Sequence, residues 1–152
     1  MFNFFYCSLY SLSYLGKDPH LCRFISYLSL FTFFMEILVT ADNLIQLFFG
    51  WEGVGLCSYL LINFWYSRIL ANKAALKAMI MNRIADVFLI LAVILIIIKL
   101  KVSEYIIIFD LITYIQNDFY YILGYNINIL SLISFLIFIG AIGKSAQIGF
   151  HT

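Results

Sequence analysis

Long apolar stretches alternate along the chain with short polar connections, a pattern typical of a membrane protein with several spanning helices. A bilayer core of about 30 Å needs about 20 apolar residues of helix to cross it. Four stretches have about this length: 24–41, 44–66, 74–98 and 127–150. Residues 1–16 are apolar and aromatic but too short to span, which predicts a half-length membrane helix.

The polar connections complete this picture. The connection at 40–43 is so short that the first two spans must be antiparallel neighbours. Within the only long connection, residues 105–116 are apolar, too short to span and contain Asp110, which predicts a helix lying at the membrane interface. We therefore expect an all-α polytopic membrane protein. The expected division is 1–23 for the half-helix and its turn, 24–98 for three transmembrane helices, 99–126 for the loop with the interfacial helix, and 127–152 for a fourth, broken transmembrane helix.

Composition agrees with a membrane location and excludes other classes. The chain is 64% hydrophobic and 11% charged, whereas a soluble domain has roughly 45–50% apolar and about 25% charged residues. A formal net charge of +1 lacks the excess of Lys and Arg that marks nucleic-acid-binding surfaces, so no nucleic-acid partner is expected. The spacing of the three cysteines fits neither a metal site nor a disulfide framework. No glycine-rich nucleotide motif follows a strand, so neither a cofactor nor a metal is expected in this chain.

Basic residues near the helix ends predict the orientation. Four spans place the N-terminal region, the turn at 66–73 and the C-terminus on one side of the membrane. That side carries Lys17, Arg23, Arg68 and Lys73, with Lys77 close by, and the opposite side carries Lys99 and Lys101. The bias places the N-terminal side in the cytoplasm or the organelle matrix.

Charged residues inside the predicted spans are the main functional candidates. Insertion costs roughly 2.5–3.5 kcal/mol for a charge at a helix centre, against a gain of about 0.3–0.6 kcal/mol for each large apolar residue. Such residues face a bundle interior or a wet cavity and mark ion or proton paths. Five occur here: Glu36, Glu52, Arg83, Asp86 and Lys144. Glu36 follows a Phe-Phe-Met run without an evident polar companion, which favours a satisfied or lipid-edge carboxyl over a pathway residue.

Glu52 begins a polar stripe. At 100° per residue, Tyr59 and Asn63 lie within about 20° of the face of Glu52, which makes them candidate proton relays. Three residues next to Glu52 lack side-chain bulk, which allows another helix to approach closely. They are Gly50, Gly53 and Gly55. The alternative is a protonated, hydrogen-bonded carboxyl with the glycines serving only for packing.

Arg83 and Asp86 are separated by three residues, so they share a helix face and can pair. In the functional interpretation, this pair is a tunable charge next to Glu52. In the alternative interpretation, it is a self-neutralised pair that merely makes insertion tolerable.

Lys144 lies among small residues. Gly140 and Gly143 weaken the helix around it, and broken helices at membrane depth often mark ion sites. If the helix continues, Gln147 and His151 share the face of Lys144 and become candidate relays. A nearby carboxylate raises the pKa of a lysine, whereas desolvation lowers it. A lysine whose carboxylate partner moves toward and away from it can therefore bind and release a proton. The alternative is a lysine that snorkels to the interface.

Four segments resemble a known family. These are LVTADNLIQLFFGWEG at 38–53, GWEGVGLCSYLLINFWYSR at 50–68, NRIADVF at 82–88 and GKSAQIGFHT at 143–152. They resemble the chain 5 subunits of mitochondrial NADH:ubiquinone oxidoreductase, respiratory complex I. The resemblance implies an antiporter-like helix bundle, with residues 8–16 as the end of the third helix and the four spans as helices four to seven.

The resemblance also implies a role for each charge. Glu52 matches the glutamate of the fifth helix, Arg83 and Asp86 match the charged pair of the sixth, and Lys144 matches the lysine of the broken seventh. The implied function is proton translocation in the mitochondrial inner membrane. The position of Glu36 looks apolar in the family, NRIAD replaces the more usual NRIGD, and helices before and after this stretch are missing. The chain is therefore expected to be one piece of a split subunit, with a truncated chain as the alternative.

Partners and cofactors follow from the same resemblance. It implies chains that complete the subunit, other membrane-arm subunits including a neighbouring antiporter-like chain, and lipids such as cardiolipin. FMN, iron–sulfur clusters, NADH and ubiquinone are expected in the complex and none of them in this chain. The alternatives are a subunit of a related cation/proton antiporter or membrane hydrogenase, and a structural remnant of such a subunit.

Overall fold

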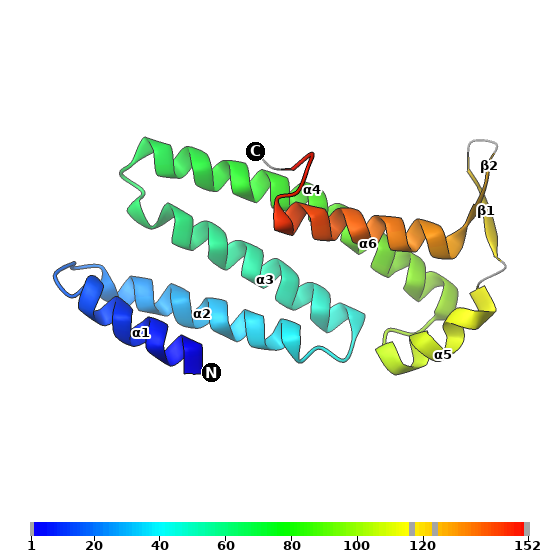
Figure 1. Cartoon of the computed structure of the whole chain (residues 1–152), viewed down its shortest axis with the longest axis horizontal. Helices are drawn as coiled ribbons and strands as arrows, with labels where there is room; N and C mark the ends of the chain where they lie inside the picture. The colour runs from blue at the N-terminus through cyan, green and yellow to red at the C-terminus, as the bar shows by residue number, and fades with distance from the viewer. Residues whose placement is uncertain (1, 116–117, 123–124, 151–152) are drawn as a thin grey trace. The chain divides into compact units, whose positions relative to one another are not determined.

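Helices dominate the computed structural model, which describes residues 2–115, 118–122 and 125–150 (Figure 1). The helices are α1 (Phe2–Tyr14), α2 (Leu21–Val39), α3 (Leu44–Ile62), the short 3₁₀ helix η1 (Asn63–Trp65), α4 (Ile69–Leu100), α5 (Tyr105–Ile115) and α6 (Ile129–Ser145). Two short strands, β1 (Phe119–Ile122) and β2 (Tyr125–Asn128), precede α6. The all-α fold class is confirmed, with one small hairpin added to it.

Two of the described helices are long and apolar enough to cross a membrane by length and composition. They are α2 with 19 residues and the continuous stretch Leu44–Trp65 with 22 residues. The apolar helices α5 and α6 are shorter, at 11 and 17 residues. The fourth stretch is shorter than expected because the hairpin takes up its first residues and the helix ends at Ser145. The count of four spanning helices stays a prediction.

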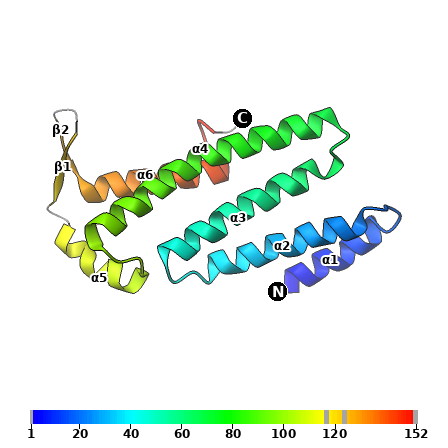
Figure 2. The same cartoon turned by 180° about the vertical axis from the view of Figure 1, so that it is seen from behind.

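The chain forms two compact units. The first unit comprises Met1–Thr40 and Phe49–Met79. In it, α1 lies alongside α2, as both views of the cartoon show (Figures 1 and 2). Pro19 lies in the connection between these two helices, where its missing N–H costs no helical hydrogen bond.

Helices α2 and α3 pack closely in the first unit. A Cβ atom placed on Gly50 would lie 2.8 Å from the backbone nitrogen of Leu38, and one on Gly53 would overlap the ring of Phe34. The later glycine meets the earlier residue of α2, so the two helices run antiparallel. The prediction drawn from the short connection at 40–43 is confirmed.

The second unit comprises Ala41–Phe48 and Ile80–Thr152. Its apolar core joins the start of α3, the second half of α4, α5 and α6, through Leu44, Ala92, Val93, Ile96, Ile108, Ile115, Ile129 and Ile133. The backbone N–H of Leu44 donates to the carbonyl of Ser103 at 2.9 Å, and that of Tyr105 donates to the carbonyl of Asp42 at 3.2 Å. These two bonds fasten the start of α3 to the connection between α4 and α5.

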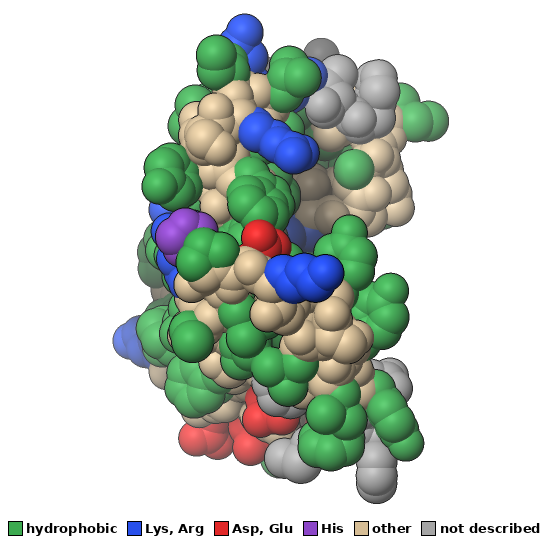
Figure 3. Space-filling view, turned by 90° about the vertical axis from the view of Figure 1, so that its left-hand side faces the viewer, with side chains coloured by type: hydrophobic (Ala, Val, Ile, Leu, Met, Phe, Trp, Pro, Cys, Tyr) green, Lys and Arg blue, Asp and Glu red, His purple; other side chains and the backbone are tan. Residues whose placement is uncertain are grey.

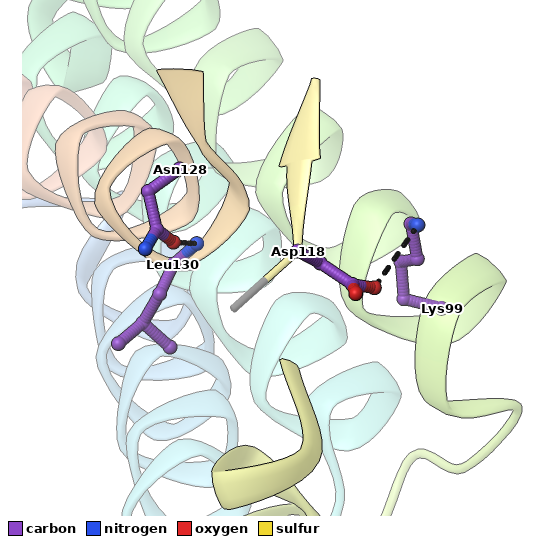
Figure 4. Close-up of polar contacts among 4 residues, drawn as sticks. All are labelled: Lys99, Asp118, Asn128 and Leu130. Atoms are coloured by element: carbon purple, nitrogen blue, oxygen red, sulfur yellow. Dashed lines mark hydrogen bonds and ion pairs between the residues drawn. The ribbon is translucent and has the colours of Figure 1, made fainter. Parts of the chain in front are cut away.

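The connection at 99–126 contains more structure than the sequence predicted. The helix expected at 105–116 is confirmed as α5, but the antiparallel hairpin β1–β2, paired from Phe119↔Asn128 to Ile122↔Tyr125, was not anticipated. Aromatic and β-branched residues favour strands, and all four residues of β1, FYYI, are of these types. The ammonium group of Lys99 lies 3.5 Å from the carboxylate of Asp118 (Figure 4) and 4.8 Å from the ring centroid of Tyr120.

Large apolar side chains point outward from both units. Phe33, Phe49, Ile80 and Phe138 are each more than half exposed, and Figure 3 shows hydrophobic side chains over much of the visible surface. Contiguous apolar surface is unfavourable in water, whereas lipid chains solvate it. The surface therefore agrees with a membrane location.

Asn128 should matter for the start of α6. Its side-chain oxygen accepts a hydrogen bond from the backbone N–H of Leu130 at 2.9 Å (Figure 4). The variant Asn128→Ala is expected to destabilise the first turn by about 0.5–2 kcal/mol because a helix-capping bond is lost. Hydrogen–deuterium exchange should be faster at residues 130–132, while Asn128→Ser, which keeps an acceptor, should stay close to the unmodified chain. Equal exchange in all three chains would contradict the capping role.

Candidate functional site

Glu52 lies half-buried in α3 of the first unit, next to the closest contact between α2 and α3. Gly50 and Gly53 flank it in sequence and lie against Leu38 and Phe34 of α2, which agrees with the packing role proposed for them. The carbonyl of Gly55 accepts a hydrogen bond from the hydroxyl of Ser58 at 2.7 Å, and its role in packing stays a prediction. Glu52 has an interaction partner in the structure.

Tyr59 and Asn63 continue from Glu52 toward the end of α3. Because α3 is α-helical through Ile62, Tyr59 lies on the face of Glu52, as the spacing predicted. Asn63 is the first residue of η1, where the tighter winding begins. Both side chains are half-buried, and the Oδ1 atom of Asn63 is fully buried without a protein hydrogen-bond partner.

Asp86 is the most unusual charged residue of the second unit. It is 6% exposed and the only charged or polar side chain in the buried class within the described residues. Arg83 lies one helical turn earlier on the unbroken helix α4 and is exposed. Both residues have interaction partners, as expected because an isolated charge in a low-dielectric interior is very costly.

Helix α6 packs against α4 directly beside Asp86. A Cβ atom on Gly140 would lie 3.1 Å from the Cβ of Leu89, and one on Gly143 would overlap the side chain of Ala85. Gly143 immediately precedes Lys144, and Ala85 immediately precedes Asp86. The two glycines therefore bring the segments that carry Lys144 and Asp86 to one helix–helix contact.

The break expected around Lys144 occurs later than the glycines suggested. Helix α6 continues through Gly140 and Gly143 and ends at Ser145, where Ala146 adopts the left-handed conformation with φ 49°. Lys144 is thus half-buried in the last turn and has an interaction partner. The shared face of Lys144 and Gln147 depended on a helix that continues, and Gln147 instead follows the helix end and is exposed. Its role as a relay stays a prediction. His151 lies outside the described residues.

Glu36 is separate from these contacts. It lies on α2 of the first unit, its side chain is exposed, and its backbone carbonyl accepts bonds from the N–H and hydroxyl of Thr40. Among the described residues, no three His, Cys, Asp or Glu side chains lie close enough to hold a metal ion.

Sequence reasoning missed the environment of Arg23. Its guanidinium carbon lies 5.2 Å from the ring centroid of Phe64 and 5.5 Å from that of Tyr66, and Nη2 donates to the carbonyl of Phe64 at 3.5 Å. The sequence identified Arg23 only as an orientation signal. Its partners are about 40 residues away in the chain, so no local pattern could have revealed them.

The fold and these residues define a class: an all-α membrane protein with charged residues on its apolar helices. Residues 41–152 match the family described as NADH:quinone oxidoreductase/Mrp antiporter, TM. The chain belongs to this family.

Curated relatives are similar over nearly the whole chain. It is 57% identical over 144 residues to the NADH-ubiquinone oxidoreductase chain 5 of Chondrus crispus, which covers 95% of this chain and 22% of that relative. It is 54% identical to the NADH-quinone oxidoreductase subunit L of Rickettsia bellii over 94% of this chain and 22% of that relative. It is 51% identical to the chain 5 of Arabidopsis thaliana over 95% and 21%. The chain thus spans about a fifth of the length of the relatives it matches.

The contact between Gly143 and Ala85 should be sensitive to one methyl group. Gly143→Ala is expected to destabilise the packing of α6 on α4 by about 1–3 kcal/mol because the added carbon overpacks the contact. The measurement is the midpoint temperature at which the detergent-solubilised chain unfolds and aggregates on heating. Adding Ala85→Gly should restore stability, and Ala141→Val, at an exposed neighbouring position, should have little effect. A midpoint temperature for Gly143→Ala equal to that of the unmodified chain would contradict the close packing of Gly143 on Ala85.

Proposed function

We propose that this chain is part of a proton-translocating membrane subunit of an NADH:ubiquinone oxidoreductase. The observation that carries the proposal is its 51–57% identity to proteins named chain 5 of that enzyme. The family match includes Glu52, Arg83, Asp86 and Lys144. The chain supplies charged groups, and the other helices of the subunit complete the proton path.

In this proposal, Lys144 alternates between its charged and neutral forms. A unit charge 4 Å away at an effective dielectric constant of 20 contributes about 4 kcal/mol, which corresponds to about a thousand-fold change in the proton affinity of an amine. Changes at Asp86 and Arg83, on the helix that packs against α6, tune that affinity. Glu52 is the second member of the proposed acid–base pair, and Tyr59, Asn63, Gln147 and His151 are the proposed relays.

The proposal extends to location and partners. We expect four spanning helices in the mitochondrial inner membrane with the N-terminal side in the matrix, because Lys and Arg are enriched on that side. The partners are other subunits of the membrane arm, including a neighbouring antiporter-like chain, and lipids. NADH, FMN, iron–sulfur clusters and ubiquinone belong to the rest of the complex in this proposal.

A cation/proton antiporter subunit is the second candidate, because the family description also includes the Mrp antiporters. Purification of the native complex distinguishes the two candidates. Copurification with flavin and iron–sulfur subunits supports the first, and copurification with antiporter subunits alone supports the second.

Removing either member of the proposed pair should reduce pumping. We expect Glu52→Gln and Lys144→Met to lower both proton translocation and coupled NADH oxidation, because neither replacement side chain can exchange a proton at these positions. The measurement is the number of protons translocated per electron in membrane vesicles, with assembly checked on native gels. Glu36→Gln, at an exposed carboxylate, serves as the matched control and should leave pumping unchanged. Normal pumping by an assembled Glu52 or Lys144 variant would refute this role for that residue.

A further inference from the structure

Asp118 joins the ends of three helices in the second unit. Its backbone N–H donates to the carbonyl of Ile115, the last residue of α5, at 3.0 Å. Its carbonyl accepts from the N–H of Ile129, the first residue of α6, at 3.2 Å. Its carboxylate lies 3.5 Å from the ammonium group of Lys99, in the last turn of α4 (Figure 4). These three interactions fix the place at which α6 begins.

Lys99 is held from a second side as well. Its ammonium group lies 4.8 Å from the ring centroid of Tyr120, within the distance of about 6 Å typical of cation–π contacts. A cation is also favourable in the last turn of a helix. Lys101, two residues further on, is exposed and forms no ion pair within the described part of the chain. The interactions at this end of α4 are therefore specific to Lys99.

The far end of α6 carries Lys144. Gly140 lies against Leu89 of α4, and the later Gly143 lies against the earlier Ala85, so the two helices run antiparallel. The first residue of α6 is thus near the end of α4, and Lys144 in the last turn of α6 is near the segment that contains Asp86. Helix α6 is fastened to α4 at both ends, by the ion pair at one and by glycine contacts at the other.

The two fastenings differ in what they resist. Glycines have no side chain to interlock with a neighbouring helix, so their contact limits separation more than sliding. Packed helices commonly shift along each other by about 1–2 Å, and a shift of that size changes the interaction of two close charges. Helix α6 has 17 residues and is about 25 Å long. A displacement at its first turn therefore reaches Lys144 if the helix moves as a rigid rod.

We propose that Lys99 and Asp118 form a clamp that sets the position of α6 along α4 and thereby holds Lys144 at the segment of Asp86. This inference rests on the proposed function and adds two positioning residues to it. Neither residue exchanges the transported proton. Both act through α6, whose first residue is bonded to Asp118 and whose last turn contains Lys144.

Proton translocation per electron tests the clamp in the assembled complex, because this ratio does not depend on how much complex assembles. Lys99→Met, which removes the ammonium group, should lower the ratio several-fold. Asp118→Asn, which keeps the shape of the side chain, should have the same effect. Lys99→Arg keeps both the ion pair and the ring contact and should retain most of the ratio. The exchanged pair Lys99→Asp with Asp118→Lys should restore part of it.

Lys101→Met is the matched control and should leave the ratio unchanged. If Lys99→Arg and the exchanged pair lower the ratio as much as Lys99→Met does, the ion pair is not the cause and the clamp is overturned. If Lys144→Met lowers the ratio while Lys99→Met and Asp118→Asn do not, the clamp is refuted and the proposed function stands. If Lys144→Met also leaves the ratio intact, the role proposed for Lys144 fails, and the clamp fails with it.

Hydrogen–deuterium exchange of the same complexes shows how far the effect of the clamp extends. In Lys99→Met, exchange should become several-fold faster at residues 143–145, in the last turn of α6, as well as at 130–132. Lys99→Arg and Lys101→Met should exchange like the unmodified chain. Faster exchange confined to 119–122 and 130–132 overturns the proposal, because the ion pair would then order only the hairpin and the first turn of α6.

Discussion

The cost of placing a polar or charged group in hydrocarbon governs this molecule. Water cannot reach most of the interior of a bilayer, so each such group must find a partner inside the protein or in a small hydrated pocket. Asp86 is the clearest case, since its side chain is nearly fully buried and has a partner. Its burial therefore makes the electrostatic environment of Asp86 the most demanding among the charged residues that the structure describes.

Small residues allow the close helix–helix contacts that lie next to the charged residues. Gly143 and Ala85 bring α6 and α4 so close that no additional methyl group fits between them, and Gly50 does the same for α3 and α2. Helix association in lipid depends on such close packing because there is little hydrophobic gain from burying one apolar surface against another. In both places a charged residue lies within two positions of the contact, Lys144 in one and Glu52 in the other. Packing and charge are therefore supplied by the same short segments.

Much of the fold followed from the pattern of the sequence, and the exceptions have physical causes. The long apolar stretches predicted the helices, and the short connection at 40–43 correctly predicted antiparallel packing of α2 and α3. The hairpin was missed because β1 and β2 have only four residues each, too few for alternation to be distinguished from an apolar loop. The glycines near Lys144 were interpreted as helix breakers, whereas α6 stays helical through both of them and packs there against Ala85 and Leu89. The helix instead ends at Ser145, where Ala146 adopts the left-handed conformation, and helix periodicity gives no signal for this end.

The charged residues themselves could be selected from the sequence because each is unfavourable in an apolar helix, whatever its neighbours. Their burial and their tertiary contacts could not be predicted in this way. Burial separates Asp86 from the exposed Arg83, although the two share a face, and Arg23 meets Phe64 only through the tertiary fold.

The two backbone bonds between the start of α3 and the connection after α4 have a mechanical consequence. Amide hydrogen bonds tolerate little stretching before they weaken, so Leu44 and Ser103 must move together, as must Asp42 and Tyr105. A displacement of the connection after α4 is therefore expected to be accompanied by a displacement of the first turn of α3, as long as these two bonds are kept.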